Sequence, residues 1–293
     1  MIYTCTCNPS LDYYLNFDEV NPGITNRSNS ESFQAGGKGI NVSLALDRLK
    51  IKSCALGFLG GFTKDYYLSF LYAYKYLQPL FVTIKDNTRI DIKIQAKQET
   101  SLNAVGPKIS KEEFLKFKSR IEKLFPGDIL VVSGNIQEEI EDDMISLINE
   151  IAKEGINVVI DTNIKIINGC LNSPIKLIRI DDEDVKDDVL NVAKDIHEKS
   201  NADIIYCGND GRCIFVGDKI YESNALTKYN KVGFGIGDSM VAGYLYSLSK
   251  GANFIESIKY SLATALININ GYEDDYINEL NNIYNEIEVN EIL

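Results

Sequence analysis

An aspartate directly follows the last of three alternating glycines in residues 231–243, which read KVGFGIGDSMVAG. The apolar residues after Asp238 recur at helical spacing, so we expect the glycines at the start of a helix. Free backbone amides and the positive end of the helix dipole favour anions there. Asp238 could take the proton of a hydroxyl that attacks phosphorus, or it could merely cap the helix. The run therefore predicts a phosphate site with a candidate base.

A second glycine cluster lies in residues 35–42 and also precedes a helical pattern. It is not a Walker loop, because Lys38 is followed by Gly39 where that loop has Ser or Thr. Neither cluster has the spacing of a dinucleotide fingerprint. We therefore expect two anion sites, one at each glycine loop.

The composition fits a globular enzyme. Of 293 residues, 45% are hydrophobic and 25% charged, which suffices for the large core of an α/β domain. A formal net charge of −12 disfavours nucleic acid as a partner. No apolar run approaches the roughly 18 residues of a membrane span, and no signal peptide is evident, so we expect a cytoplasmic protein without a membrane partner. The six cysteines are expected to be reduced core residues, and a single histidine disfavours a histidine-rich metal site.

Short aliphatic runs alternate with helical patterns along the chain. These runs are 2–4, 52–56, 129–132, 157–160, 177–180 and 204–207. The alternation predicts an α/β fold with a mostly parallel sheet covered by helices, and catalytic groups at the carboxyl ends of its strands. Ser133, Asp161 and Asp181 each follow such a run. Two segments, near 11–34 and 87–104, have instead the pattern of strands with one solvent-exposed face.

Five motifs occur in the order and spacing of the PfkB family of sugar kinases, and the resemblance covers essentially the whole chain. They are the N-terminal run 1–13, Gly-Gly-Lys-Gly-Ile-Asn at 36–41, Gly-Phe-Leu-Gly-Gly-Phe at 57–62, Thr-Arg-Ile-Asp at 88–91 and Gly-x-Gly-x-Gly-Asp at 233–238. Within the family, the chain most resembles bacterial 1-phosphofructokinases, followed by tagatose-6-phosphate kinases. The resemblance implies a ribokinase-like fold with helices on both faces of the sheet, and a single kinase domain over residues 1–293. It also implies a small β-sheet lid from the strands near 11–34 and 87–104, through which a homodimer could form.

At the sugar end, the resemblance implies a set of contacts to a sugar phosphate. They are Asp12, Gly36, Gly37, Lys38, Asn41, Arg89, Arg27 and Ser133. Asp12 would accept hydrogen bonds from sugar hydroxyls, while Lys38 and Arg89 would hold a phosphate already on the substrate. Asp12 and Arg27 could instead be ordinary surface residues.

At the nucleotide end, the chain departs from the family pattern. Arg-Ile-Asp-Asp-Glu-Asp at 179–184 replaces the usual Lys-Pro-Asn-x-x-Glu. Asp181 and Asp184 could organise a hydrated Mg²⁺ for ATP, or the acidic stretch 181–188 could be a solvated helix start. The bulk of Ile236, in place of the family's alanine, could crowd the anion site. The implied nucleotide contacts are Asp181, Cys207, Gly208, Gly211 and Gly233.

The resemblance implies transfer of the ATP γ-phosphoryl group to the free primary hydroxyl of a ketohexose monophosphate. Asp238 would be the base, and the transferring group would be stabilised by the amides of Gly235, Ile236, Gly237 and Asp238. We expect fructose 1-phosphate as the substrate and fructose 1,6-bisphosphate as the product. The alternatives are a tagatose-6-phosphate or fructose-6-phosphate kinase, and a sugar-phosphate sensor with weak kinase activity.

Overall fold

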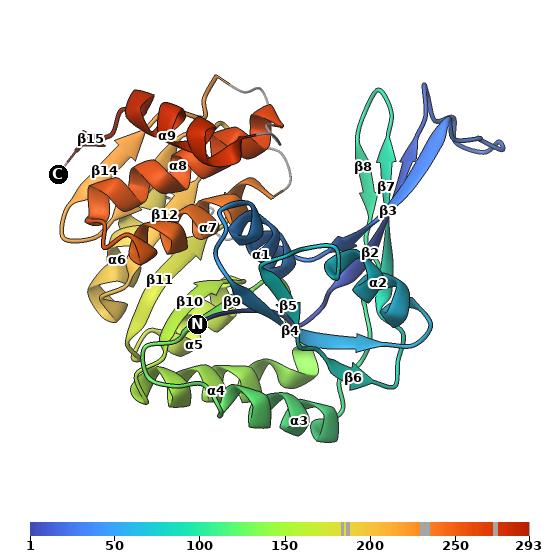
Figure 1. Cartoon of the computed structure of the whole chain (residues 1–293), viewed down its shortest axis with the longest axis horizontal. Coiled ribbons are helices and arrows are strands. Elements are labelled where there is room, and N and C mark those ends of the chain that lie inside the picture. Colours follow the sequence, from blue (N-terminus) through green and yellow to red (C-terminus); the bar gives the residue numbers. More distant parts are fainter. Residues whose placement is uncertain (183–184, 186–187, 229–234, 272–274, 293) are drawn as a thin grey trace.

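The structure, a computed structural model, describes residues 1–182, 185, 188–228, 235–271 and 275–292. The candidate residues Asp184 and Gly233 lie outside this part of the chain. The described strands form one large sheet and one small sheet (Figure 1).

The large sheet has a parallel centre and an antiparallel edge. Its strand order is β15-β14-β13-β12-β11-β10-β9-β1-β4-β5, with β6 paired to β4. The pairs from β12 through β1 to β5 and β6 are parallel, and the pairs from β12 to β15 are antiparallel. The strands are β1 (Ile2–Thr6), β4 (Ser53–Gly60), β5 (Leu77–Pro79), β6 (Val82–Ile84), β9 (Ile129–Ser133), β10 (Asn157–Asp161), β11 (Ile175–Ile180), β12 (Asp203–Cys207), β13 (Cys213–Val216), β14 (Ile220–Ser223) and β15 (Asn290–Glu291). All six aliphatic runs fall in this sheet, so the expected α/β fold is confirmed.

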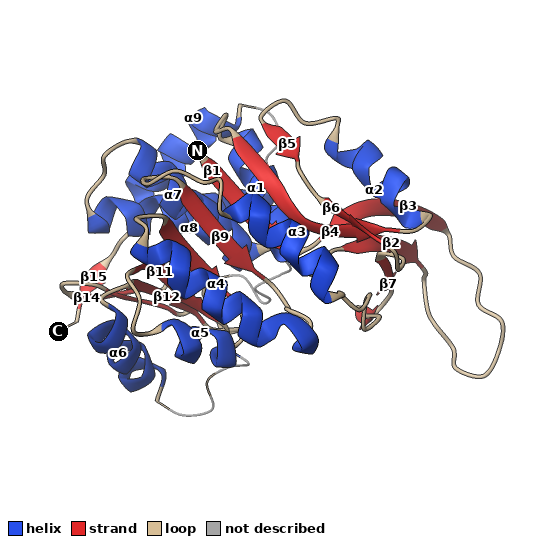
Figure 2. Cartoon of the chain, turned by 90° about the horizontal axis from the view of Figure 1, so that it is seen from below, coloured by secondary structure: helices blue, strands red, loops and turns tan. Residues whose placement is uncertain are grey.

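Helices cover both faces of the large sheet (Figure 2). One face carries α3 (Lys111–Ile121), α4 (Glu141–Lys153), α5 (Ile164–Cys170) and α6 (Val189–Ser200). The other face carries α1 (Lys38–Arg48), α7 (Ile236–Ser249), α8 (Phe254–Asn270) and α9 (Tyr276–Glu286). A short 3₁₀ helix (Glu138–Ile140) precedes α4, and α2 (Thr63–Leu71) packs against β4 and β3 (Ser30–Gly36).

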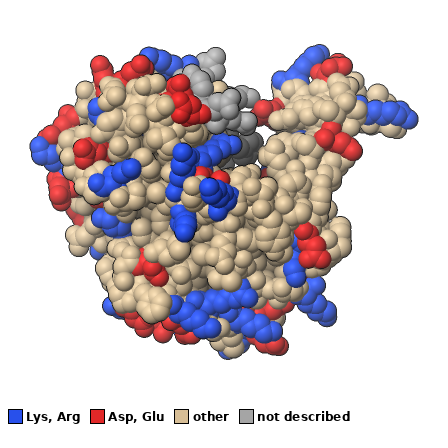
Figure 3. Space-filling view, viewed as in Figure 1, with Lys and Arg blue, Asp and Glu red and all other residues tan. Residues whose placement is uncertain are grey.

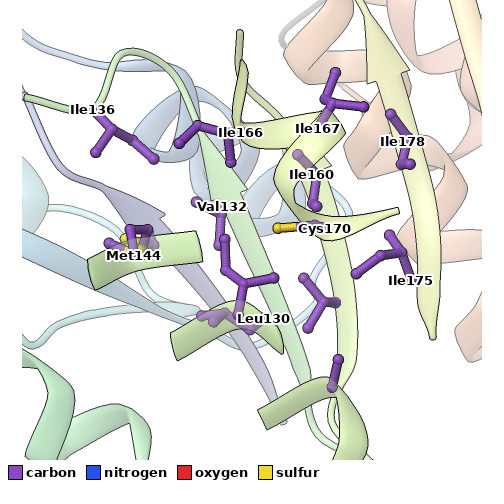
Figure 4. Close-up of a cluster of buried hydrophobic side chains, with 14 of the residues drawn as sticks. Leu130, Val132, Ile136, Met144, Ile160, Ile166, Ile167, Cys170, Ile175 and Ile178 are labelled. Atoms are coloured by element: carbon purple, nitrogen blue, oxygen red, sulfur yellow. The ribbon is translucent and has the colours of Figure 1, made fainter. Parts of the chain in front are cut away.

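Successive residues of the central strands pack into opposite layers. In β9, Leu130 and Val132 join the core beneath α4 and α5 (Figure 4), whereas Val131 joins the core beneath α7 and α8. This follows from the two-residue period of a strand. Because both layers are apolar, the strand reads as a continuous aliphatic run rather than an alternating one.

The small sheet has the strand order β3-β2-β7-β8. Its strands are β2 (Ser10–Asn16), β3 (Ser30–Gly36), β7 (Arg89–Gln95) and β8 (Thr100–Leu102), so the strands expected near 11–34 and 87–104 are confirmed. We name it the lid sheet after the role that the resemblance implies. It stands beside the large sheet, and the face in Figure 3 is hollowed between the two. Within the described residues, no helix combines the length and the apolarity needed to cross a membrane.

Candidate active site

The two predicted glycine loops begin helices that pack against each other. Gly37 precedes α1 and Gly235 precedes α7, and neither start has a side-chain cap. Gly235 has a φ of 78°, a left-handed conformation that glycine adopts without a steric penalty. The uncapped amides of both helices can therefore face an anion, as the sequence predicted.

Asp238 lies in the first turn of α7 and is 4% exposed. Asn41 of α1 donates a hydrogen bond of 2.8 Å from Nδ2 to Oδ2 of Asp238. Gly235 occupies the cap position, so the alternative that Asp238 merely caps the helix is wrong. The bond instead joins the two glycine loops through the side chain of the candidate base.

Burial raises the pKa of Asp238 to about 7, with a further contribution from the negative charge of Asp161. The charges of Arg179 and Lys38 and the hydrogen bond from Asn41 act in the opposite direction. A carboxylate with a pKa near neutrality is well matched to accept a proton at physiological pH.

A cluster of buried and half-buried charges lies beside Asp238. Arg179 of β11 donates two hydrogen bonds of 2.6 Å, from Nη1 to Asp161 Oδ1 and from Nη2 to Asp181 Oδ1. Lys38 of α1 also pairs with Asp181, and its Nζ lies 3.5 Å from Asp161 Oδ1. We name Arg179, Asp161, Asp181 and Lys38 the charge cluster. Its members come from α1, from the ends of β10 and β11, and from the residue after β11.

The charge cluster is tied to α7 by close packing. A Cβ on Gly237 would lie only 2.1 Å from Cζ of Arg179, so no larger residue fits above the guanidinium. Burial opposes the ionisation of Asp181, but Arg179 and Lys38 outweigh it and lower the pKa of Asp181. Burial likewise opposes the charge of Lys38, and Asp161 and Asp181 raise its pKa on balance. Asp181 and Lys38 are therefore charged at neutral pH, and Asp181 is no solvated helix start.

The pairing of Lys38 with Asp181 changes one expectation from the sequence. We expected separate sites at the two glycine loops, with Lys38 at the sugar end and Asp181 at the nucleotide end. In the structure these side chains form one ion pair across 143 positions of sequence. The helix that follows the first glycine loop and the end of β11 therefore meet at the charge cluster.

The chain matches the profile of the pfkB family carbohydrate kinases over residues 6–278. This chain belongs to the pfkB family. It is 35% identical over 277 residues to a 1-phosphofructokinase of Borreliella burgdorferi, covering 90% of each chain. It is 31% identical to a tagatose-6-phosphate kinase of Staphylococcus epidermidis, covering all of both chains. Phosphofructokinase-2 of Escherichia coli, solved with substrates and products, has the same fold, with a TM-score of 0.88, 23% identity and coverage of 98% of this chain and 99% of that one. The resemblance and the sugar-kinase class inferred from the sequence are thus confirmed.

Asp12 and Ser133 are two polar residues of the predicted sugar end. Asp12 of β2 accepts a hydrogen bond of 2.6 Å from Ser10, and a Cβ on Gly36 would lie 2.3 Å from its Oδ2. Burial raises the pKa of Asp12, which disfavours a plain surface role. Ser133 ends β9, and its buried Oγ has no hydrogen-bond partner among the described residues. Both side chains remain candidates for contact with a polar ligand.

The two predicted arginines lie in different surroundings. The guanidinium of Arg89 donates to the backbone oxygens of Asn8, at 3.1 Å, and Ala104, at 3.0 Å, and it pairs with Asp91 at 3.1 Å. Arg89 therefore already ties the lid sheet to the segment after β1. Arg27 is exposed on the loop between β2 and β3.

Cys207, Gly208 and Gly211, the predicted nucleotide contacts, lie at the end of β12 and in the hairpin that follows it. The thiol of Cys207 is buried, so this residue can offer a ligand chiefly its backbone. Asp182 accepts hydrogen bonds from the Tyr206 hydroxyl and, at 2.6 Å, from Asn209 Nδ2. The hairpin is thereby anchored next to Asp181.

The expectation that Ile236 could crowd the anion site is wrong. Its side chain is 2% exposed and packs in the hydrophobic core between the large sheet and α7. Its backbone amide still belongs to the uncapped first turn of the helix, so the substitution leaves room for an anion.

Two polar residues around the site were missed as candidates from the sequence, Arg179 and Asn268, whereas Asp161 was noted only for its place at the end of a strand. Asn268 of α8 donates to the carbonyl of Gly235, at 3.3 Å, and to Ser239 Oγ, at 3.0 Å, which fixes the turn before α7. Arg179 could have been recognised in the sequence, because a charged residue inside an aliphatic strand needs a buried partner. Asn268 lies on an ordinary amphipathic helix, and no sequence pattern marks it as part of the site.

The raised pKa of Asp238 predicts the pH dependence of catalysis. As pH falls below about 7, Asp238 gains a proton and can no longer accept one, so kcat/KM should fall. Asp161→Asn removes a nearby negative charge that raises this pKa, so its acidic limb should lie at lower pH. Initial rates measured across pH give the acidic limb of the wild type and of Asp161→Asn. A wild-type profile level down to about pH 5, as for an ordinary aspartate, would contradict the assignment.

Proposed function

We propose that this protein transfers the γ-phosphoryl group of ATP to the free primary hydroxyl of fructose 1-phosphate, giving fructose 1,6-bisphosphate. The observation that carries the proposal is the buried carboxylate of Asp238 at a helix start, held by Asn41 and flanked by the cations Lys38 and Arg179. A base beside cations suits a hydroxyl that attacks a phosphate. The relative named 1-phosphofructokinase supports the choice of sugar phosphate.

Each group of the site has a distinct part in this reaction. Asp238 accepts the proton of the attacking hydroxyl, and the backbone amides of residues 235–238 stabilise the negative charge on the transferring group. Lys38 and Arg179 neutralise phosphate oxygens, and Asp12 orients the sugar hydroxyls. Because the lid sheet carries Asp12, the lid would also exclude water from the reacting phosphate.

Magnesium fits the carboxylates of the charge cluster. Oδ2 of Asp161 is buried without a hydrogen-bond partner among the described residues. Asp181 lies close to Asp161, because Arg179 donates hydrogen bonds to both carboxylates. Mg²⁺ prefers such oxygen ligands and keeps several waters, so Asp161 would hold it together with ATP, while Asp181 and Asp184 would act on it through bound water. The side-chain oxygen of an asparagine at position 181 could still accept a hydrogen bond from such a water. When bound, the ion would offset negative charge on the ATP phosphates.

The whole chain, residues 1–293, would act as one kinase domain in the cytoplasm, where ATP and sugar phosphates occur.

We place a homodimer contact on the lid sheet. Tyr13 and Phe33 stack there with ring centroids 4.2 Å apart, and Phe33 contacts Tyr66, which is 48% exposed. Such an aromatic cluster is typical of protein interfaces.

Sedimentation should give a dimer that Phe33→Asp dissociates, and a wild-type monomer would contradict this contact.

A coupled assay tests the function with fructose 1-phosphate, fructose 6-phosphate, tagatose 6-phosphate and free fructose. We expect the highest kcat/KM with fructose 1-phosphate and almost no turnover of fructose. Preference for tagatose 6-phosphate would favour the activity of the Staphylococcus relative instead. Binding of a sugar phosphate without ATP turnover would indicate a sensor and contradict the kinase.

Asp238→Asn should lower kcat at least about 100-fold, because general-base catalysis typically contributes that much. Binding of the sugar phosphate should be nearly unchanged, since the base acts mainly in the transition state. Steady-state kinetics and calorimetry measure the two quantities. A mutant that retained more than about a tenth of the wild-type kcat would exclude Asp238 as the base.

Asp181→Asn should strengthen binding of both substrates. The carboxylate of Asp181 competes with phosphates for Lys38 and Arg179, so its removal should lower both KM values, by about fivefold for one partly buried charge. Asp188→Asn is the matched control, because it removes a charge from the same acidic stretch while asparagine can still cap α6. Unchanged KM values in Asp181→Asn, as in the control, would show that the carboxylate does not compete with phosphate.

A further inference from the structure

Two cysteines face each other beside the candidate nucleotide hairpin. Cys207, the last residue of β12, is the cross-strand partner of Cys213, the first residue of β13. The Cys213 thiol donates a hydrogen bond to Cys207 Sγ with the two sulfurs 2.8 Å apart. Both cysteines are free thiols, and neither side chain has a part in the proposed phosphoryl transfer.

The strand geometry at this pair suits a disulfide. The amide of Gly208 donates to the carbonyl of Arg212, so the backbone hydrogen bond lies at the pair next to the two cysteines. The pair of Cys207 and Cys213 then occupies a position where opposite side chains approach most closely. Only a short movement separates a 2.8 Å sulfur contact from the bond length of about 2.05 Å.

A bond at this place would act on the hairpin. The pair closes the loop 208–212, which contains the candidate nucleotide contacts Gly208 and Gly211. Asn209 within the loop bonds to Asp182, the neighbour of Asp181 in the charge cluster. A shift at the base of the loop is therefore passed on to both the loop and the cluster.

We propose that Cys207 and Cys213 form a redox modification site, at which a peroxide converts the thiol pair into a disulfide that weakens nucleotide binding. The effect on the nucleotide rests on the proposed function, whereas the disulfide itself does not. Cys207 is the attacking sulfur, because it accepts the hydrogen bond and is 6% exposed, while Cys213 is fully buried.

The reaction balances with one hydrogen peroxide. The sulfur of Cys207 attacks one peroxide oxygen, the O–O bond breaks, and the thiol proton leaves with the other oxygen as water, which gives a sulfenic acid. The sulfur of Cys213 then attacks the sulfur of Cys207 and the S–O bond breaks. The hydroxyl takes the Cys213 proton and leaves as a second water. Two thiols are oxidised to one disulfide, and the peroxide is reduced.

A second pair of thiols provides an internal comparison. Cys5 and Cys7 lie at the end of β1 and just after it, with their sulfurs 3.7 Å apart. Residues two apart on an extended chain have Cα atoms about 6.6 Å apart, near the upper limit for a disulfide. We therefore expect Cys5 and Cys7 to stay reduced under conditions that oxidise Cys207 and Cys213.

The test is peroxide treatment of the full chain, followed by intact mass, peptide mapping and calorimetry with ATP. We expect the loss of two hydrogen atoms, a linked pair of peptides containing Cys207 and Cys213, and an ATP dissociation constant raised about tenfold, the effect of losing roughly one hydrogen bond from the loop. Dithiothreitol should restore the affinity. Cys213→Ala should keep its affinity after peroxide, whereas Cys170→Ala, a buried cysteine of α5 in the other core layer, should respond like the wild type.

Two results would overturn the proposal. One is mapping that finds Cys207 and Cys213 unlinked in the treated wild-type chain, which needs no variant to fold. The other is a linked pair with unchanged ATP affinity. If the reduced protein failed to bind ATP at all, the kinase proposal would fail, and the mapping alone would still decide whether the disulfide forms.

Discussion

The pairing of Arg179 with Asp161 and Asp181 is the interaction on which the candidate site depends. Arg179 is 7% exposed, and removing one partner of a buried ion pair typically costs about 3 to 5 kcal/mol because a charge is left uncompensated. Both carboxylates must therefore lie within hydrogen-bond distance of the guanidinium. This requirement fixes the ends of β10 and β11 relative to each other. Gly237 lies against the same guanidinium, so the start of α7 is fixed as well.

The charge cluster also gives a physical meaning to the chain's departure from the family pattern. An aspartate at position 181 adds negative charge where ATP phosphates are expected, yet this charge is balanced by Arg179 and Lys38. An arginine holds two carboxylates in fixed directions through its planar fork, whereas a lysine acts as a point charge with rotatable donors. Arg179 and Asp181 therefore fit each other as a pair.

Much of the fold could be predicted from the sequence, because it depends on local patterns. Aliphatic runs marked the central strands, and the glycine loops marked the starts of α1 and α7. The contacts that assemble the site join residues far apart in the chain, such as Lys38 and Asp181, and no local pattern encodes them. The same limit explains Ile236, whose side chain packs into the core rather than the anion site. A residue type indicates which chemistry is available, but only the packing determines where its side chain points.

The most direct measurement of the central claim is a crystal structure with fructose 1-phosphate and a non-hydrolysable ATP analogue. The account predicts the free primary hydroxyl within hydrogen-bond distance of the Asp238 carboxylate, about 2.6 to 3.2 Å, with phosphate oxygens on Lys38 and Arg179. A complex in which that hydroxyl lies away from Asp238, with Lys38 and Arg179 still paired only to carboxylates, would contradict it.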